Sequence, residues 1–256
     1  MNTSIIVCTY NEEETIFGVV AACCKHNPDA EIIVVDDAST DSTEEVLSSL
    51  AMHYEFEYLK LDKNRGKSYA MAHGVEYATN EVILFFNANV KDIREHHFSN
   101  MLNPIFQGKA DLVLGLPSAY TVDFRINPYK SVVGQKAMLK EDLLPILDDI
   151  RELRFGVESY ITLYYQTIGK RMHFVSLDGL QTLLDKTFDE QLNDDAEGSL
   201  EVANALLTNI DLITKRVQNN IQKTQNYTRS TISSVQLELN KRMKMLKERN
   251  GEIELA

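Results

Sequence analysis

The sequence has no tryptophan, only three cysteines, and no apolar run that approaches 18 residues. A membrane-spanning helix needs a longer apolar run, so no transmembrane segment is expected. The first apolar strand begins within a few residues of Met1, which leaves no room for a signal peptide. Three irregularly spaced cysteines favour a reducing compartment. These features predict a cytoplasmic protein.

Charge is unevenly spread along the 256 residues, whose formal net charge is -12. Residues 215–249 carry nine Lys and Arg and two Glu, which leaves 17 basic and 36 acidic residues for the rest. An acidic body disfavours nucleic acid as a partner. The basic tail is suited to an anionic surface or to the acidic body of a neighbouring subunit.

Short apolar runs alternate with segments of helical pattern, which predicts an α/β fold with a mostly parallel sheet flanked by helices. In such sheets ligands bind outside the carboxyl ends of the strands. Strands are predicted at residues 4–8, 31–35, 54–61, 81–86, 111–114 and 171–175, and helices at 12–25, 67–77, 141–149 and 157–168.

Three regions are expected: a large α/β domain at residues 1–180, an acidic linker at 181–198 and a long amphipathic helix at 199–256. The apolar and threonine positions of the helix recur in steps of three, four and four. This period gives about 3.67 residues per turn and a one-sided stripe. The stripe predicts packing on the body, a homo-oligomeric coiled coil, or peripheral contact with the inner face of a membrane. The stripe lacks Trp and Phe, which disfavours binding of this helix at a membrane interface.

Polar side chains follow three of the predicted strands. Two adjacent acids directly after an apolar strand need partners, because burying an unpaired charge is costly. A carboxylate there can accept the imide N–H of uracil or the amide edge of guanine. The clusters are Thr9, Tyr10, Asn11 and Glu12, then Asp36, Asp37 and Ser39, then Asn87, Ala88 and Asn89.

Three motifs carry a resemblance to a known family. They are Cys-Thr-Tyr-Asn-Glu from residue 8, Val-Asp-Asp-Ala-Ser-Thr-Asp from residue 35 and Asn-Arg-Gly-Lys-Ser-Tyr-Ala from residue 64. In order and spacing the chain resembles the inverting family 2 glycosyltransferases of GT-A fold, above all the polyprenyl-phosphate sugar transferases. The resemblance covers about residues 3–180. It implies a nucleotide-diphosphate sugar, with the base near Asp36 and Asp37 and with Lys67 near the nucleotide or its phosphates.

The family has an Asp-x-Asp motif where this chain has Asn87, Ala88 and Asn89. Two carboxylates would hold Mg²⁺ or Mn²⁺ against the diphosphate, whereas amides supply only neutral oxygens. Lys91 stands where some members have a third ligand, and an ammonium can bind a diphosphate itself. Three interpretations stay open: a metal-independent transferase in which Lys91 assists the leaving group, a degenerate nucleotide-sugar binder, and weak metal binding through the two amides.

Inverting transfer to a hydroxyl needs a general base. Glu158 lies in a segment that resembles the place where the family has a Glu-Asp pair, with Ser159 as the second residue. The alternative for Glu158 is an acid at the start of a helix, which the helix dipole favours. His173 is a further, weak candidate metal ligand.

The polar and aromatic segment 117–136 is expected to be an irregular acceptor-side loop. Its last residues resemble the Gly-x-Arg acceptor-side element of the family. The acceptor-side or phosphate-side candidates are Arg125, Lys130, Gln135 and Lys136.

The resulting prediction is a glycosyltransferase that moves a hexose from a UDP- or GDP-sugar to a polyprenyl phosphate or a cell-surface glycan precursor. The alternative is a non-catalytic nucleotide-sugar-binding or scaffold subunit that assembles through its C-terminal helix.

Overall fold

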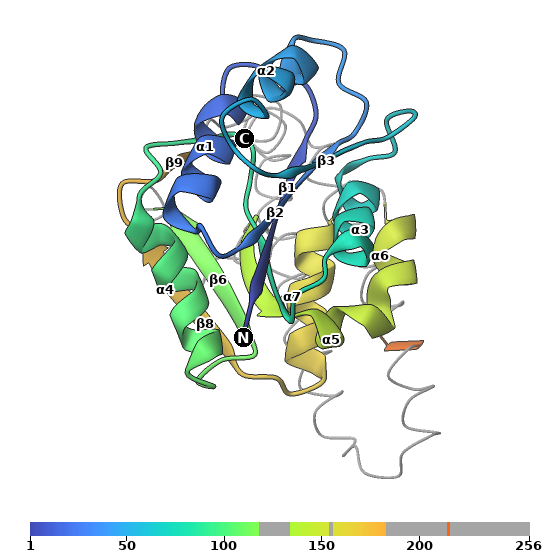
Figure 1. Ribbon diagram of the computed structural model, residues 1–256. Helices are drawn as coiled ribbons and strands as arrows, with labels where there is room; N and C mark the ends of the chain where they lie inside the picture. Colours follow the sequence, from blue (N-terminus) through green and yellow to red (C-terminus); the bar gives the residue numbers. More distant parts are fainter. Residues whose placement is uncertain (118–133, 154–155, 183–213, 216–256) are drawn as a thin grey trace, which may run out of the picture.

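The computed structural model describes residues 1–117, 134–153, 156–182 and 214–215. Its centre is a seven-stranded sheet with helices on both faces (Figure 1). The strand order is β3-β2-β1-β4-β7-β6-β8, and a separate ribbon pairs β5 with β9. The strands are β1 Thr3–Thr9, β2 Glu31–Asp36, β3 Glu57–Lys60, β4 Val82–Phe85, β5 Val90–Lys91, β6 Leu112–Pro117, β7 Gln135–Leu139, β8 Met172–Leu177 and β9 Gln181–Thr182.

Helices cover both faces of the sheet, as a mainly parallel sheet requires. Successive strand residues point to opposite faces, so Ile6 and Ile33 pack under α3, α6 and α7, whereas Ile5 and Val34 pack under α1 and α4. Figure 1 shows these two helical layers. The helices are α1 Ile16–His26, α2 Thr43–Leu50, α3 Lys67–Tyr77, α4 Glu95–Phe106, α5 Lys140–Leu143, α6 Leu147–Glu152 and α7 Val157–Thr167, with a 3-10 turn at Leu144–Ile146.

The sheet is parallel except at β7, which runs antiparallel to both β4 and β6. The prediction that residues up to 136 form an irregular loop is therefore wrong at Gln135 and Lys136. Both belong to a central strand, and their side chains are buried. Because Lys136 interrupts the apolar residues of this strand, the sequence pattern does not predict a buried strand here.

Two predicted helices have different bounds in the structure. The helix expected at 12–25 begins at Ile16. The acids before it bind loop groups: Glu12 accepts from the Thr15 hydroxyl, and Glu13 accepts from the backbone N–H of Ser42. The helix expected at 141–149 is divided into α5, a 3-10 turn and α6. Pro145 lies at this break, since proline has no N–H to continue the helical ladder.

The α/β domain extends slightly beyond its predicted end. Gln181 and Thr182 pair with Lys91 and Val90, so the first two residues of the expected linker belong to the fold. The remaining linker and the long C-terminal helix lie outside the described residues, apart from 214–215, which are helical. The long helix therefore stays a prediction.

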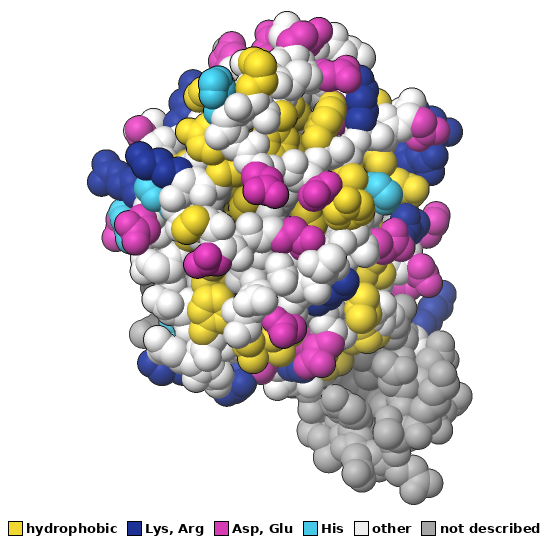
Figure 2. Space-filling view, viewed as in Figure 1, with side chains coloured by type: hydrophobic (Ala, Val, Ile, Leu, Met, Phe, Trp, Pro, Cys, Tyr) yellow, Lys and Arg dark blue, Asp and Glu magenta, His cyan; other side chains and the backbone are white. Residues whose placement is uncertain are grey.

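In the described part of the chain, none of the helices has the length and apolarity needed to cross a membrane. On the face seen in Figure 2, Asp and Glu side chains lie over the middle and upper parts, and Lys and Arg lie mainly along the margins. The described residues form no continuous basic patch on this face.

Candidate functional site

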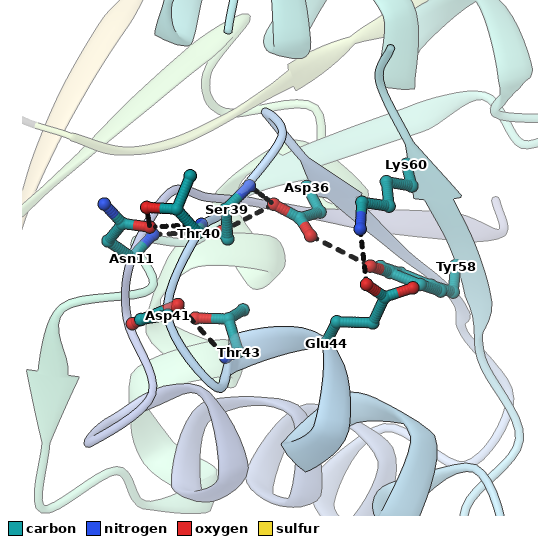
Figure 3. Close-up of polar contacts among 9 residues, drawn as sticks. All are labelled: Asn11, Asp36, Ser39, Thr40, Asp41, Thr43, Glu44, Tyr58 and Lys60. Carbon is teal, nitrogen blue, oxygen red and sulfur yellow. Dashed lines mark hydrogen bonds and ion pairs between the residues drawn. The ribbon is translucent and has the colours of Figure 1, made fainter. Parts of the chain in front are cut away.

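The loops that follow β1 and β2 are bound to each other at the carboxyl edge of the sheet. The N–H of Asn11 donates to Ser39 Oγ at 2.9 Å, and the N–H of Thr40 donates to Asn11 Oδ1 at 2.8 Å (Figure 3). Asn11 and Ala38 adopt left-handed φ values of 56° and 62°, which turn both loops tightly. The first two motifs thus form one structural unit.

Asp36 fixes the second loop from inside. Its side chain is fully buried; Ser39 donates to Oδ1 from both N and Oγ, and the Tyr58 hydroxyl donates to Oδ2 at 2.8 Å (Figure 3). These three donors explain how a carboxylate is tolerated in the core. Direct contact between Asp36 and a nucleotide base stays a prediction; the contacts in this structure are internal to the protein.

Asp37 connects the second motif to the third. Its two oxygens accept the backbone N–H groups of Arg65 and Gly66, each at 2.7 Å. Burial raises the pKa of Asp37, and these two N–H groups partly oppose the increase. Gly66 has φ of 90°, a conformation that favours glycine, and it directly precedes α3. The three motifs therefore meet at one edge of the sheet.

The third strand end lies beside this unit. Asn87 is half-buried and packs against Gly134, where an added Cβ would lie 2.0 Å from Asn87 Nδ2. Residue 134 must therefore be glycine for Asn87 to keep its place. Ala88 is buried and Asn89 is half-buried, so the predicted third cluster is brought to the same edge.

Lys67 is the residue that joins the clusters. Its Nζ lies 2.7 Å from Glu158 Oε1 and 3.2 Å from Asn87 Oδ1. Burial lowers the pKa of Lys67, but the attraction of Glu158 outweighs this and the pKa is raised. Sequence reasoning selected all three residues separately and did not predict their contact.

Glu158 lies in the first turn of α7 and faces two lysines. Burial raises its pKa, but Lys67 and then Lys136 outweigh burial, and the pKa is lowered. Lys136 is fully buried in β7, and desolvation is the main reason why its pKa falls to about 7. Gln135 and Lys136 are buried at the carboxyl end of β4, and their predicted position on the acceptor or phosphate side stays a prediction.

Among the described residues, Asn87 and Asn89 offer a divalent cation only neutral amide oxygens where the family has carboxylates. Asn87 Oδ1, the expected ligand atom, already accepts a contact from the Lys67 ammonium. Among the described residues there is no group of three His, Cys, Asp or Glu that could hold a metal. His173 pairs with Val113 near the beginning of β6, away from the carboxyl edge, so its candidacy as a ligand at this site is wrong.

The other predicted site residues have different positions. Lys91 is exposed on β5 and pairs with Gln181, and its role toward a diphosphate stays a prediction. Arg125 and Lys130 lie outside the described residues. Two buried polar atoms, Thr9 Oγ1 and Gln135 Nε2, have no hydrogen-bond partner among the described residues, and their strands flank β4.

Sequence reasoning missed several residues that shape the site. Tyr58 and Gly134 hold Asp36 and Asn87 by contacts between distant segments, and no local pattern marks them. Cys8, on β1, lies in the field of Lys67, and burial raises its pKa to about 12.

The fold and the three strand-end motifs define an α/β domain of GT-A type. Residues 4–164 match the model of the family described as "Glycosyl transferase family 2". The chain therefore belongs to glycosyltransferase family 2.

Curated relatives have partial similarity to this chain. The poly-beta-1,6-N-acetyl-D-glucosamine synthase of Staphylococcus epidermidis is 30% identical over 87 residues, which are 34% of this chain and 21% of that protein. The undecaprenyl-phosphate 4-deoxy-4-formamido-L-arabinose transferase of Pectobacterium atrosepticum is 33% identical over 97 residues, 36% of this chain and 30% of that protein. The matches thus span between a fifth and a third of these relatives.

A solved structure shares the fold over most of the chain. Glucosyl-3-phosphoglycerate synthase from Mycobacterium tuberculosis, in complex with Mn²⁺ and UDP-glucose, superposes with a TM-score of 0.64 at 17% identity. The superposition covers 81% of this chain and 78% of that one. At this identity the likeness establishes the architecture.

Proposed function

We propose that this protein transfers a hexose from a UDP- or GDP-sugar to a polyprenyl phosphate or a cell-surface glycan precursor. The observation that carries the proposal is the meeting of the three family motifs with Lys67 and Asn87 at one sheet edge. The names of the relatives support an undecaprenyl phosphate or a growing glycan as acceptor, and the neighbour's complex supports a UDP-sugar donor.

We further propose that transfer does not require a metal ion. Diphosphate charge must be neutralised as the glycosidic bond breaks, and positively charged side chains at a fixed position can do this. Lys67, the first residue of α3, is one such cation because it contacts Asn87 after β4. Lys91 is the second candidate, on the ribbon that follows Asn87. Both would stabilise the departing nucleoside diphosphate.

The lowered pKa of Glu158 favours a phosphate acceptor over an alcohol acceptor. A general base works best when its pKa is near the operating pH, and the pKa of Glu158 is lowered by Lys67 and Lys136. A phosphate oxygen is already ionised and needs no strong base. It can attack the anomeric carbon directly, while the bond from that carbon to the diphosphate oxygen breaks and the nucleoside diphosphate leaves.

Lys91→Ala is expected to reduce turnover by about tenfold if its ammonium helps the leaving group, because one charged hydrogen bond is worth that much. The assay measures transfer from labelled UDP-glucose, UDP-N-acetylglucosamine and GDP-mannose to undecaprenyl phosphate, with undecaprenol as the matched alcohol. Lys109→Ala, an exposed lysine between α4 and β6, is the control. Unchanged turnover in Lys91→Ala would show that Lys91 does not assist the leaving group. Faster transfer to undecaprenol than to undecaprenyl phosphate would contradict a phosphate acceptor.

A second candidate function is a nucleotide-sugar-binding scaffold without turnover. It is favoured by the ion pair of Glu158 with Lys67, which makes this carboxylate a weak base. Calorimetry would then detect UDP or GDP binding while none of the donor–acceptor pairs gives product. Product formation with any pair would exclude this candidate.

The basic, amphipathic tail at residues 199–256 is proposed to assemble the cytoplasmic protein into a homo-oligomer or to hold it at the inner membrane face. Deleting the residues after Gly198 is expected to convert an oligomer into a monomer, because the one-sided stripe would lose its partner. Size-exclusion chromatography with light scattering measures the mass. An unchanged mass would exclude the tail as the oligomer interface, and flotation with anionic liposomes would then test membrane contact.

A further inference from the structure

The Lys67 ammonium is well placed to meet an anion at the carboxyl edge of the sheet. Its side chain is 46% exposed, although its Nζ contacts Glu158 and Asn87. An ammonium has three N–H donors, and the two described contacts use two of them. Lys67 is therefore held in position and still has a donor for a ligand.

Glu158 restrains Lys67 from the buried side of the site. Its side chain is only 12% exposed, and its Oε1 lies 2.7 Å from Lys67 Nζ. A carboxylate in this position restricts a long, flexible lysine to one place, and α7 fixes the carboxylate in turn. Glu158 thus acts through Lys67, as a positioning residue.

Lys136 supplies a second cation behind Glu158. It is fully buried on the central strand β7, opposite Phe85 of β4 and Leu114 of β6. Its electrostatic partners include Glu158 on α7 and Lys67 on α3. Two lysines around one carboxylate give the group one net positive charge when all three are ionised, which suits a bound anion.

We propose that Lys67, Glu158 and Lys136 form a built-in cationic site that takes the place of a metal ion and binds the diphosphate of the donor. Lys67 contacts the phosphate oxygens, Glu158 positions Lys67, and the ammonium form of Lys136 adds positive charge behind the carboxylate. The inference rests on the proposed nucleotide-diphosphate donor. It differs from the role proposed for Lys91, because the cation here is already in contact with the third strand-end cluster.

Calorimetric titration with UDP and GDP in EDTA tests this site without turnover. The wild-type protein is expected to bind one of them without metal, and Lys67→Met to weaken binding about 10- to 100-fold. Lys67→Arg keeps the charge and is expected to restore part of the affinity. Glu158→Gln is expected to weaken binding less than Lys67→Met, whereas Lys109→Met leaves it unchanged.

The failures of the two proposals give different results. Nucleotide binding that persists in Lys67→Met, or that appears only with Mn²⁺, would overturn the cationic site and leave the donor assignment standing. Lack of UDP and GDP binding by the folded wild-type protein, with and without Mn²⁺, would overturn the proposed donor as well. Circular dichroism and thermal unfolding of each variant establish that it is folded.

Discussion

Lys136→Met is expected to make the protein more stable and to weaken its nucleotide binding at the same time. Burial disfavours the ammonium, so its replacement by an apolar side chain of similar length removes a desolvation penalty. The stability gain is on the order of a few kcal/mol, and each kcal/mol raises Tm by about 2–4 °C in a domain of this size. Loss of its charge weakens UDP or GDP binding by about tenfold or more.

The pH dependence of the stability gain in Lys136→Met shows whether the buried charge of Lys136 causes it. Lysine titrates near 10.4 in an unfolded chain, whereas the pKa of Lys136 in the fold is about 7. Between these values the unfolded state binds more protons, so wild-type stability rises with pH. The advantage of Lys136→Met is therefore largest at pH 7 and below, and it shrinks toward pH 10. Urea unfolding at several pH values measures it; an equal advantage at pH 7 and pH 10 would contradict the buried charge.

The double variant Asn87→Asp with Asn89→Asp is expected to lose nucleotide binding in EDTA by about tenfold or more and to regain it with Mn²⁺. The new carboxylate at residue 87 pairs with Lys67, whose Nζ lies 3.2 Å from Asn87 Oδ1, and it repels the diphosphate. Carboxylates also supply the charged oxygens that Mn²⁺ needs.

Asn103→Asp is the matched control for the charge change, because Asn103 is exposed on α4. Calorimetry with UDP and GDP, in EDTA and in Mn²⁺, compares the variants. Tighter binding of the double variant in EDTA would contradict the role of Lys67, and binding that Mn²⁺ does not restore would show that more than the two amides separates this site from a metal site.

The convergence of the motifs was predictable because it depends on a general property of parallel sheets. Apolar runs located β1, β2 and β4, and the polar residues after them had to meet at the carboxyl edge. The loops were less predictable. The sequence places a base near Asp36, which stays a prediction, but it did not show that Ser39 and Tyr58 bind the oxygens of Asp36.

The charged group at the centre of the site could not be predicted in its present form. Sequence spacing says nothing about the contact between Lys67 and Glu158, which come from α3 and α7. Lys136 was expected on the acceptor or phosphate side from a resemblance to the Gly-x-Arg element, and the sequence did not show that it lies inside a strand. Since β7 is antiparallel, its first residues lie at the carboxyl edge of β4, and this places Lys136 beside Glu158.

The contact with Lys67 supports a proposed explanation for the amide at residue 87. The exposed Lys67 ammonium contacts the oxygen that a metal would need, and a buried lysine, Lys136, interacts electrostatically with the same carboxylate, Glu158. The family's metal site would be replaced by charges of the chain itself. This interpretation joins the sequence difference and the structure in one account.

The most direct test of the account is sugar transfer by the full chain in EDTA. Labelled UDP- and GDP-sugars are supplied with undecaprenyl phosphate, and the initial rate is compared with and without chelator and with added Mn²⁺. The account predicts transfer at the same rate in all three conditions. Transfer that EDTA abolishes and Mn²⁺ restores would contradict it.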